Sequence, residues 1–342
     1  MIHVSRAVIL CLMLVALLTG VADAWDRGHA ERFATLPPGT AHPEGLAADH
    51  AGNIWAADFD VSKSSGPGDV IAFRPDGALL RHLSVSGSSN LLLGLDFHPA
   101  TGALLVIDFG AKNVLRVDPI SGASTVFTTI PGGAAAGPNA LTFDAAGNVY
   151  VSDSFQGTIW RTGPTGGVST PWASSPLLAT TGTPPFGANG LAFNRARTTL
   201  FVANTGDDTI VQIAVNPDGS AGAASVFTNS INGADGLMID DHDNLWVCAN
   251  QSDEIVVVDP TGKAIAKLGD FDGVNQRGEP IGLLFPASLV RSGGHLYVTN
   301  LSLDLKAAIG RPAIDGPWAA QVTRHTIARL PFRIPEVREP ND

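Results

Sequence analysis

The sequence predicts an all-β protein, a six-bladed β-propeller whose ring is closed by an N-terminal strand. One unit recurs six times: an apolar strand, a tight turn, a second strand ending in Asp or Asn, and a third strand. The units begin at Glu44, Leu93, Asn139, Asn189, Asp235 and Ser288, a period of about 46–53 residues that is typical of propellers. The chain has 38 Gly and 23 Pro but only 15% charged residues, which favours short strands and tight turns over helices.

Within each unit the strands follow from apolar runs bounded by Gly, Asp, Asn or Pro. First strands are expected at Glu44–Asp49, Leu93–Phe97, Asn139–Asp144, Asn189–Phe193, Asp235–Asp240 and Ser288–Val290. Second strands are expected at Gly52–Asp58, Leu104–Asp108, Asn148–Asp153, Leu200–Asn204, Asn244–Asn250 and Leu296–Asn300. Third strands are expected at Val70–Phe73, Val114–Val117, Thr158–Arg161, Thr209–Ile213, Glu254–Val258 and Thr326–Leu330. Fourth strands are visible in four units, at Leu80–Val85, Thr125–Thr129, Ser225–Thr228 and Ala264–Leu268.

The sixth unit has no obvious fourth strand of its own. Residues Glu31–Leu36, which precede the first unit, alternate between polar and apolar side chains as a strand does. If they pair with the sixth unit, the ring closes and no sheet edge stays open. We therefore expect a single six-bladed domain over residues 25–342.

Residues 1–24 have the pattern of a secretory signal peptide. A short start containing Arg6 is followed by an apolar run from Ala7 to Leu18 and by a small-residue cleavage site ending at Ala24. The apolar run is too short to span a bilayer as a helix. We expect a secreted or periplasmic protein with no membrane association once the signal is removed.

The charge balance excludes one class of partner. The chain carries 21 Lys and Arg against 32 Asp and Glu, a net charge of −11. Such an acidic protein is not expected to bind nucleic acid. A small-molecule substrate is expected instead, and the sequence does not predict an oligomeric state.

The long loops are expected to share one face of the ring. Alternating strand direction places the turns between strands one and two, and between three and four, on the opposite face, where they are short. The long connections are 61–69, 131–138, 174–187, 271–284 and 303–322. Long loops on one side of a rigid scaffold indicate a functional face, and the first residue of each unit opens onto it.

Five of the six residues that begin the units carry a side-chain oxygen, Leu93 being the exception. Propeller symmetry brings these positions together around the channel. Glu44 and Asp235 supply two carboxylates, and Asn139 and Asn189 supply two neutral carbonyls. Such an oxygen set suits a hard cation, above all Ca²⁺, whereas the absence of His from the ring disfavours zinc. The same residues are also good turn formers, so this pattern alone leaves a purely structural role open.

The segments Pro43-Glu44-Gly45, Pro138-Asn139, Ala188-Asn189-Gly190-Leu191 and Gly233-Ala234-Asp235-Gly236-Leu237 resemble the senescence-marker-protein/gluconolactonase family. That family consists of six-bladed propellers related to paraoxonases and squid-type phosphotriesterases. The resemblance implies that Glu44, Asn139, Asn189 and Asp235 bind one catalytic divalent cation, most often Ca²⁺. Members often have Asp after the first ligand Asn, where this chain has Ala140. The squid-type enzymes bind a second cation through an acid where this chain has Met238, so one metal is expected.

These features lead to the hypothesis of a secreted, metal-dependent hydrolase of a lactone or related ester. Asp235 is the candidate catalytic residue, as general base or as nucleophile. Asp58, Asp153, Phe186 and Ser288 are candidate pocket residues, although the strand-end acids recur in every unit and therefore also suit loop hydrogen bonding. Trp172, Phe285 and Trp318 could supply further apolar walls.

Two alternatives remain from the sequence. One is a non-catalytic propeller that binds a ligand or protein on the long-loop face, since this fold hosts many functions. The other is a strictosidine-synthase-like or lyase propeller, which would not need the whole ring of ligands.

Overall fold

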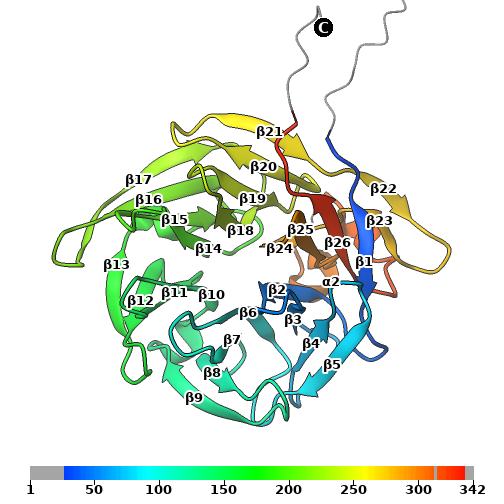
Figure 1. Ribbon diagram of the computed structural model, residues 1–342, viewed down its shortest axis with the longest axis horizontal. Coiled ribbons are helices and arrows are strands. Elements are labelled where there is room, and N and C mark those ends of the chain that lie inside the picture. The colour runs from blue at the N-terminus through cyan, green and yellow to red at the C-terminus, as the bar shows by residue number, and fades with distance from the viewer. Residues whose placement is uncertain (1–26, 312–313, 336–342) are drawn as a thin grey trace, which may run out of the picture.

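A computed structural model describes residues 27–311 and 314–335, which form six four-stranded antiparallel sheets arranged in a ring (Figure 1). The predicted six-bladed β-propeller is thus confirmed. The first strand of each blade lies nearest the centre, and the later strands lie progressively outward. The signal peptide predicted for residues 1–24 lies outside the described residues.

The first three blades are built from consecutive strands. Blade one contains β2 (Pro43–Ala48), β3 (Ile54–Asp58), β4 (Asp69–Phe73) and β5 (Leu79–Ser84). Blade two contains β6 (Leu92–Phe97), β7 (Leu104–Asp108), β8 (Asn113–Val117) and β9 (Ser124–Thr129). Blade three contains β10 (Pro138–Phe143), β11 (Val149–Asp153), β12 (Thr158–Thr162) and β13 (Thr170–Ser174).

The other blades complete the ring. Blade four contains β14 (Ala188–Phe193), β15 (Thr199–Asn204), β16 (Thr209–Val215) and β17 (Ala221–Asn229). Blade five contains β18 (Ala234–Ile239), β19 (Leu245–Ala249), β20 (Glu254–Val258) and β21 (Ala264–Leu268). Blade six contains β24 (Pro286–Ser292), β25 (His295–Asn300), β26 (Thr326–Pro331) and β1 (Glu31–Thr35).

Strand β1 closes the ring as the sequence predicted. It pairs antiparallel with β26, with Glu31 opposite Arg329 and Thr35 opposite Thr326. Arg329 also donates two hydrogen bonds to the Glu31 carboxylate. The last blade therefore joins strands from both ends of the described chain, and β26 gains a partner on its outer side.

The core consists of six apolar clusters, one between each pair of neighbouring blades. The cluster that joins blades six and one contains Ala34 of β1 together with Tyr297 and Phe73. Because inner strands such as β3 and β7 are buried on both faces, each blade packs on both of its neighbours, which explains the high hydrophobic fraction of the sequence.

A repeated Asp turn shapes the face opposite the long loops. Asp240 Oδ1 accepts from the backbone N–H groups of His242 and Asn244, and Oδ2 accepts from Asn244 Nδ2 and Trp246 Nε1. Asp49 and Asp144 make the equivalent bonds in blades one and three. One carboxylate thus fixes both the tight turn and the aromatic ring that follows it.

The structure contains elements that the repeat pattern did not reveal. Strand β13 was not identified because Pro171 interrupts its apolar pattern, although proline is tolerated on an outermost strand. The segment predicted as a loop over 271–284 contains a hairpin, β22 (Phe271–Val274) and β23 (Pro280–Gly282), which packs against β1.

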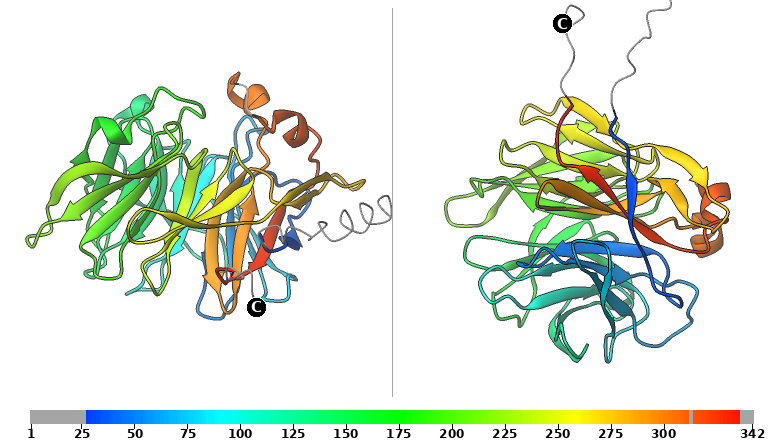
Figure 2. Two further views of the ribbon diagram at one scale, coloured as in Figure 1. Left: turned by 90° about the horizontal axis from the view of Figure 1, so that it is seen from above. Right: turned by 45° about the vertical axis from the view of Figure 1, so that its right-hand side comes forward.

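Short helices occupy three of the long connections. These are η1 (Gly133–Ala135), η2 (Pro176–Leu178), α2 (Leu305–Ile309) and α3 (Gly316–Ala319). Helices α2 and α3 rise from one face of the ring (Figure 2). Within the described ranges no helix has both the length and the hydropathy needed to cross a membrane.

Candidate metal centre

The inner strand of every blade has an irregular register at its first residues. In blade three, Pro138 pairs with Asp153 but the next paired residue is Leu141, so Asn139 and Ala140 lie in a bulge. The same shift occurs in the other five blades. A bulge re-aims side chains, and here it places one residue per blade at the channel mouth.

The register corrects one position of the predicted ring. The residue after the first paired residue is Glu44, Leu93, Asn139, Asn189, Asp235 and, in blade six, Ala287. Ser288, which the sequence alignment of the units placed in the ring, lies one residue further along. The error arose because blade six lacks the glycine that follows the ring residue in four of the other blades.

Glycine follows the ring residue in four blades because the inner strands approach each other closely there. A Cβ at Gly190 would lie 2.4 Å from the backbone oxygen of Asp235, and one at Gly236 would lie 2.5 Å from that of Ala287. Such contacts are too short for a side chain. The glycines therefore let the ring residues of adjacent blades converge.

Three of the four predicted ligands present a buried oxygen that has no hydrogen-bond partner. These atoms are Glu44 Oε2, Asn139 Oδ1 and Asp235 Oδ1. All three residues are at most 6% exposed. Buried polar atoms are nearly always paired, so three unpaired oxygens from three blades point to a missing positive partner.

Hydroxyl groups fix the orientation of the two amides. Ser154 Oγ donates to the backbone oxygen of Ala188, so it accepts from Asn139 Nδ2, 3.2 Å away. Thr205 Oγ1 likewise donates to Ala234 O and accepts from Asn189 Nδ2 at 2.9 Å. Each hydroxyl thus binds the nitrogen of its amide, which fixes which end of the side chain is nitrogen and which is oxygen. In Asn139 the oxygen then has no protein partner and is free to bind a ligand.

The two carboxylates are held in an environment that penalises negative charge. Burial raises the pKa of Glu44 well above its usual range, and repulsion from Asp235 adds to this effect. Burial also raises the pKa of Asp235 to about 7, although the hydrogen bond from Asn250 and the nearby Asn189 amide and Gly236 N–H groups oppose the change. Two buried acids in one site are expected to be stable as carboxylates only beside a cation.

A small pocket of about 40 Å³ lies at these oxygens. Its polar lining is the ring itself together with Thr205 and Asn250. Asn250 Nδ2 donates to Asp235 Oδ2 at 2.8 Å, which leaves Asp235 Oδ1 for a ligand. The remaining lining is apolar and comes from Phe59, Leu93, Pro184, Phe186 and Phe285 and from Leu301, Leu303 and Leu305 beside α2.

Of the four candidate pocket residues, Asp58, Asp153, Phe186 and Ser288, one lines the pocket. Phe186 lines the pocket. Ser288 lies farther down the channel, on the side away from the pocket. Asp153 accepts from the Gly137 N–H, the Gln156 side chain and Trp160 Nε1, so it organises a loop. Of the other aromatic candidates, Phe285 lines the pocket, whereas Trp172 packs on Tyr150 and Trp318 on Phe271.

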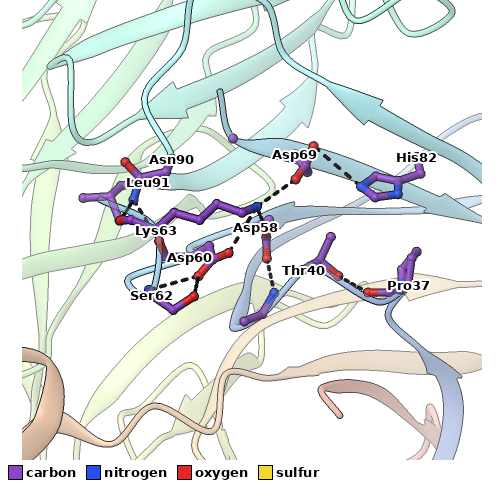
Figure 3. A network of polar contacts seen from close by, with 12 residues as sticks. Pro37, Thr40, Asp58, Asp60, Ser62, Lys63, Asp69, His82, Asn90 and Leu91 are labelled. Atoms are coloured by element: carbon purple, nitrogen blue, oxygen red, sulfur yellow. Dashed lines mark hydrogen bonds and ion pairs between the residues drawn. The ribbon is translucent and has the colours of Figure 1, made fainter. Parts of the chain in front are cut away.

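Asp58 belongs to a separate polar network around Lys63 (Figure 3). Lys63 Nζ lies 3.1 Å from Asp60 Oδ2, 3.2 Å from Asp69 Oδ2 and 3.8 Å from Asp58 Oδ2. Burial raises the pKa of Asp58 to about 8, against the Ala41 N–H and Lys63, which favour the charged form. This network anchors the loop that carries Phe59 and does not line the pocket.

The residues present fit a hard divalent cation. Among the described residues no group of three or more His, Cys, Asp and Glu could hold a metal ion, so the site depends on amide oxygens as well as carboxylates. Two carboxylates and neutral carbonyl oxygens are a donor set that Ca²⁺ accepts. Glu44, Asn139, Asn189 and Asp235 would hold such an ion.

Sequence reasoning missed the residues that support this set. Ser154 and Thr205 both directly follow the strand-end Asp or Asn of their blades, so extending the repeat alignment by one residue would have found them. Asn250 was seen only as a strand-end residue, yet it contacts Asp235.

Comparison with known proteins gives one family match and several structures of the same fold. Residues 111–269 match the family model described as SMP-30/Gluconolactonase/LRE-like region. No curated protein matches the chain significantly.

Among solved structures, a luciferin-regenerating enzyme matches with a TM-score of 0.64 and 16% identity, over 88% of this chain and 95% of that chain. A gluconolactonase from Xanthomonas campestris matches with a TM-score of 0.59 and 17% identity, over 90% and 91%. A calcium-binding protein, regucalcin, from Agrobacterium tumefaciens matches with a TM-score of 0.60 and 14% identity, over 91% and 98%. At these identities the structural matches show a shared fold.

The resemblance seen in the sequence is therefore confirmed by this match: the chain is a six-bladed β-propeller whose residues 111–269 are similar to the SMP-30/gluconolactonase/LRE-like family.

Proposed function

We propose that this protein is a secreted, Ca²⁺-dependent hydrolase of lactones or related esters. The observation that carries the proposal is the set of three buried, unpartnered oxygens on Glu44, Asn139 and Asp235 at the floor of a pocket. The family match and the gluconolactonase and regucalcin neighbours support a lactonase-type reaction and a bound cation. The signal pattern at residues 1–24 supports secretion.

A bound divalent cation would polarise the carbonyl group of the substrate and stabilise the negative charge that develops on its oxygen. Asp235 is the proposed catalytic residue. Its Oδ2 is fixed by Asn250, and its Oδ1 faces the pocket floor without a protein partner. From this position Asp235 either takes a proton from the attacking water or attacks the carbonyl carbon itself.

The other residues of the ring and the hydroxyl groups beside it hold the cation-binding oxygens in position. Glu44 balances charge, while Ser154 and Thr205 hold the amides of Asn139 and Asn189 in place. The apolar walls exclude bulk water, which strengthens every electrostatic interaction at the floor.

The proposal is tested by stripping divalent ions with a chelator and measuring hydrolysis of a panel of lactones and aryl esters. Activity should fall to background and return with CaCl₂. Asp235→Asn should lower kcat/KM by about 100-fold or more. Asp96→Asn provides a matched control, because Asp96 also lies on an inner strand but lines the far side of the channel.

Hydrolysis that survives chelation would contradict the metal mechanism. Binding of the compounds without turnover at any Ca²⁺ concentration would favour the alternative of a non-catalytic binding propeller. Formation of a product without uptake of water would instead favour a lyase.

A further inference from the structure

The pocket contains almost no polar group that could recognise a hydroxylated substrate. Outside the ring, its polar lining residues are Thr205 and Asn250, and both are already engaged. Thr205 Oγ1 donates to Ala234 O and accepts from Asn189, while Asn250 donates to Asp235 and accepts from Gln251 Nε2. A sugar lactone would therefore bury several hydroxyl groups without partners in this pocket.

A continuous aromatic surface leads from the pocket to the outside. Phe59 and Phe186 line the pocket. The ring of Phe59 lies 5.9 Å from that of Phe109, which lies 5.7 Å from that of Phe155. Phe155 stacks on Phe186 at 5.6 Å, and Phe109 lies 6.5 Å from Phe186. We call these four residues the Phe cluster.

The outer part of the Phe cluster is open to water. Phe155 is 46% exposed, whereas Phe59 is 9% exposed. Exposed aromatic side chains that continue into a pocket typically mark a binding surface. Phe59, Phe109 and Phe155 come from equivalent loops of blades one, two and three, so the apolar surface lies on one side of the channel mouth.

Leucines beside α2 bound the pocket opposite the ring. Leu301, Leu303 and Leu305 are buried with Phe59 and Phe285 in one cluster, and Phe109 packs against it. The lining of the pocket is thus polar only at its floor.

We propose that the substrate of this site is a lactone or ester carrying an apolar chain or ring, which the Phe cluster binds while the carbonyl group reaches the ring oxygens. This inference rests on the proposed function for the identity of the reactive group. A polyhydroxylated sugar lactone is a poor substrate on this account. Selectivity comes from apolar contact along Phe186 and Phe155.

The test compares δ-lactones that share one ring: δ-valerolactone, its propyl, pentyl and heptyl derivatives, and D-glucono-δ-lactone, all with saturating CaCl₂. We expect kcat/KM to rise about two- to fourfold per added methylene until the chain leaves the Phe cluster. D-glucono-δ-lactone should be at least tenfold worse than the pentyl derivative. A flat chain-length series, or a preference for D-glucono-δ-lactone, overturns the inference.

Substitutions of Phe155 test whether the Phe cluster causes the dependence of kcat/KM on chain length. Phe155→Ala should flatten the dependence on chain length, and Phe155→Leu should restore part of it, because both changes alter the apolar area of a side chain that is 46% exposed. Ile120→Ala is the matched control, since Ile120 is 69% exposed on the opposite face. An unchanged slope in Phe155→Ala overturns the assignment of the Phe cluster.

A binding measurement separates this inference from the proposed function. Cyclopentanone and 2-pentylcyclopentanone have a carbonyl group but no bond to hydrolyse, so calorimetry reports affinity alone. Tighter binding of the pentyl ketone, lost in Phe155→Ala, supports the apolar site even if no lactone is hydrolysed, in which case only the proposed function fails. Equal affinity of the two ketones counts against the apolar site even if lactones are hydrolysed.

Discussion

His325 illustrates how a buried residue away from the ring sets the acid stability of the protein. Its side chain is buried, its Nδ1 has no partner, and its ring meets that of His42 at 4.4 Å. Burial, with help from His42, lowers the pKa of His325 to about 3, while Asp60 and the Leu301 carbonyl act in the opposite direction. The folded protein therefore keeps this imidazole neutral under mildly acidic conditions.

A pH dependence of stability follows. Below pH 6.5 the unfolded chain binds a proton at His325 while the folded protein does not until about pH 3. The unfolding free energy should therefore fall as pH is lowered through this window, by up to about 1.4 kcal/mol per pH unit from this group. In His325→Gln the slope measured by urea unfolding between pH 6.5 and 4 should be shallower. The control His50→Gln, at an exposed histidine, should keep the wild-type slope; equal slopes in all three proteins would contradict the assignment.

At the ring itself, residue identity alone gave the four candidate ligands but not the residues that hold them in place. That Glu44, Asn139, Asn189 and Asp235 meet at the channel mouth could be predicted because they recur at one place in the repeat. Ser288 was misplaced by one residue because the position of the bulge depends on strand pairing, which the sequence of one strand does not reveal. The role of Asn250 depends on a contact to the neighbouring strand and was equally invisible.

At the scale of elements, the loop from Phe59 to Asp69 depends on one lysine. Lys63 is 32% exposed, whereas Asp58 is fully buried and Asp60 and Asp69 are mostly buried. Asn90 Nδ2 also donates to the backbone oxygens of Asp60 and Lys63, so the loop is tied to blade two. The wall residue Phe59 begins this loop.

Removing the ammonium group of Lys63 should loosen this loop. Lys63→Met keeps the apolar stem but leaves three aspartates facing one another, so the unfolding free energy should fall by about 1–3 kcal/mol, less than for a fully buried ion pair because water reaches one side. Thermal unfolding and KM are the measurements, and KM should rise because Phe59 loses its anchor. Lys263→Met, in a turn on the opposite face, is the control. Identical melting temperatures and KM values would show that the network is dispensable.

Strands could be predicted where the repeat pattern was clear. They could not be predicted where contacts with distant parts of the chain, rather than the local sequence, determine that a strand forms. The inner three strands of each blade follow from apolar runs between turn residues. Strand β13 contains Pro171 and is held by its neighbour in the blade, and the β22–β23 hairpin is held against β1 by Glu279, which accepts from Arg32 and Thr35. Neither contact has a local signature.

At the scale of the whole molecule, the ring depends on β1 joining the last blade. Without β1, β26 would have an unpaired edge and the cluster between blades six and one would lose Ala34 and Leu36. A variant that lacks residues 1–36 should therefore melt at least about 5 °C lower than one that lacks residues 1–26, and should aggregate more readily. Equal melting temperatures for the two truncations would contradict the closure role of β1.

In the function proposed here, the channel mouth at the centre of the ring is built around a cation. The most direct test is isothermal titration calorimetry of chelator-stripped protein with CaCl₂, comparing the wild type with Asp235→Asn and Asp96→Asn. We expect one Ca²⁺ per chain in the wild type and in Asp96→Asn, and at least about tenfold weaker binding in Asp235→Asn. No measurable binding to the wild type, or binding that Asp235→Asn leaves unchanged, would contradict it.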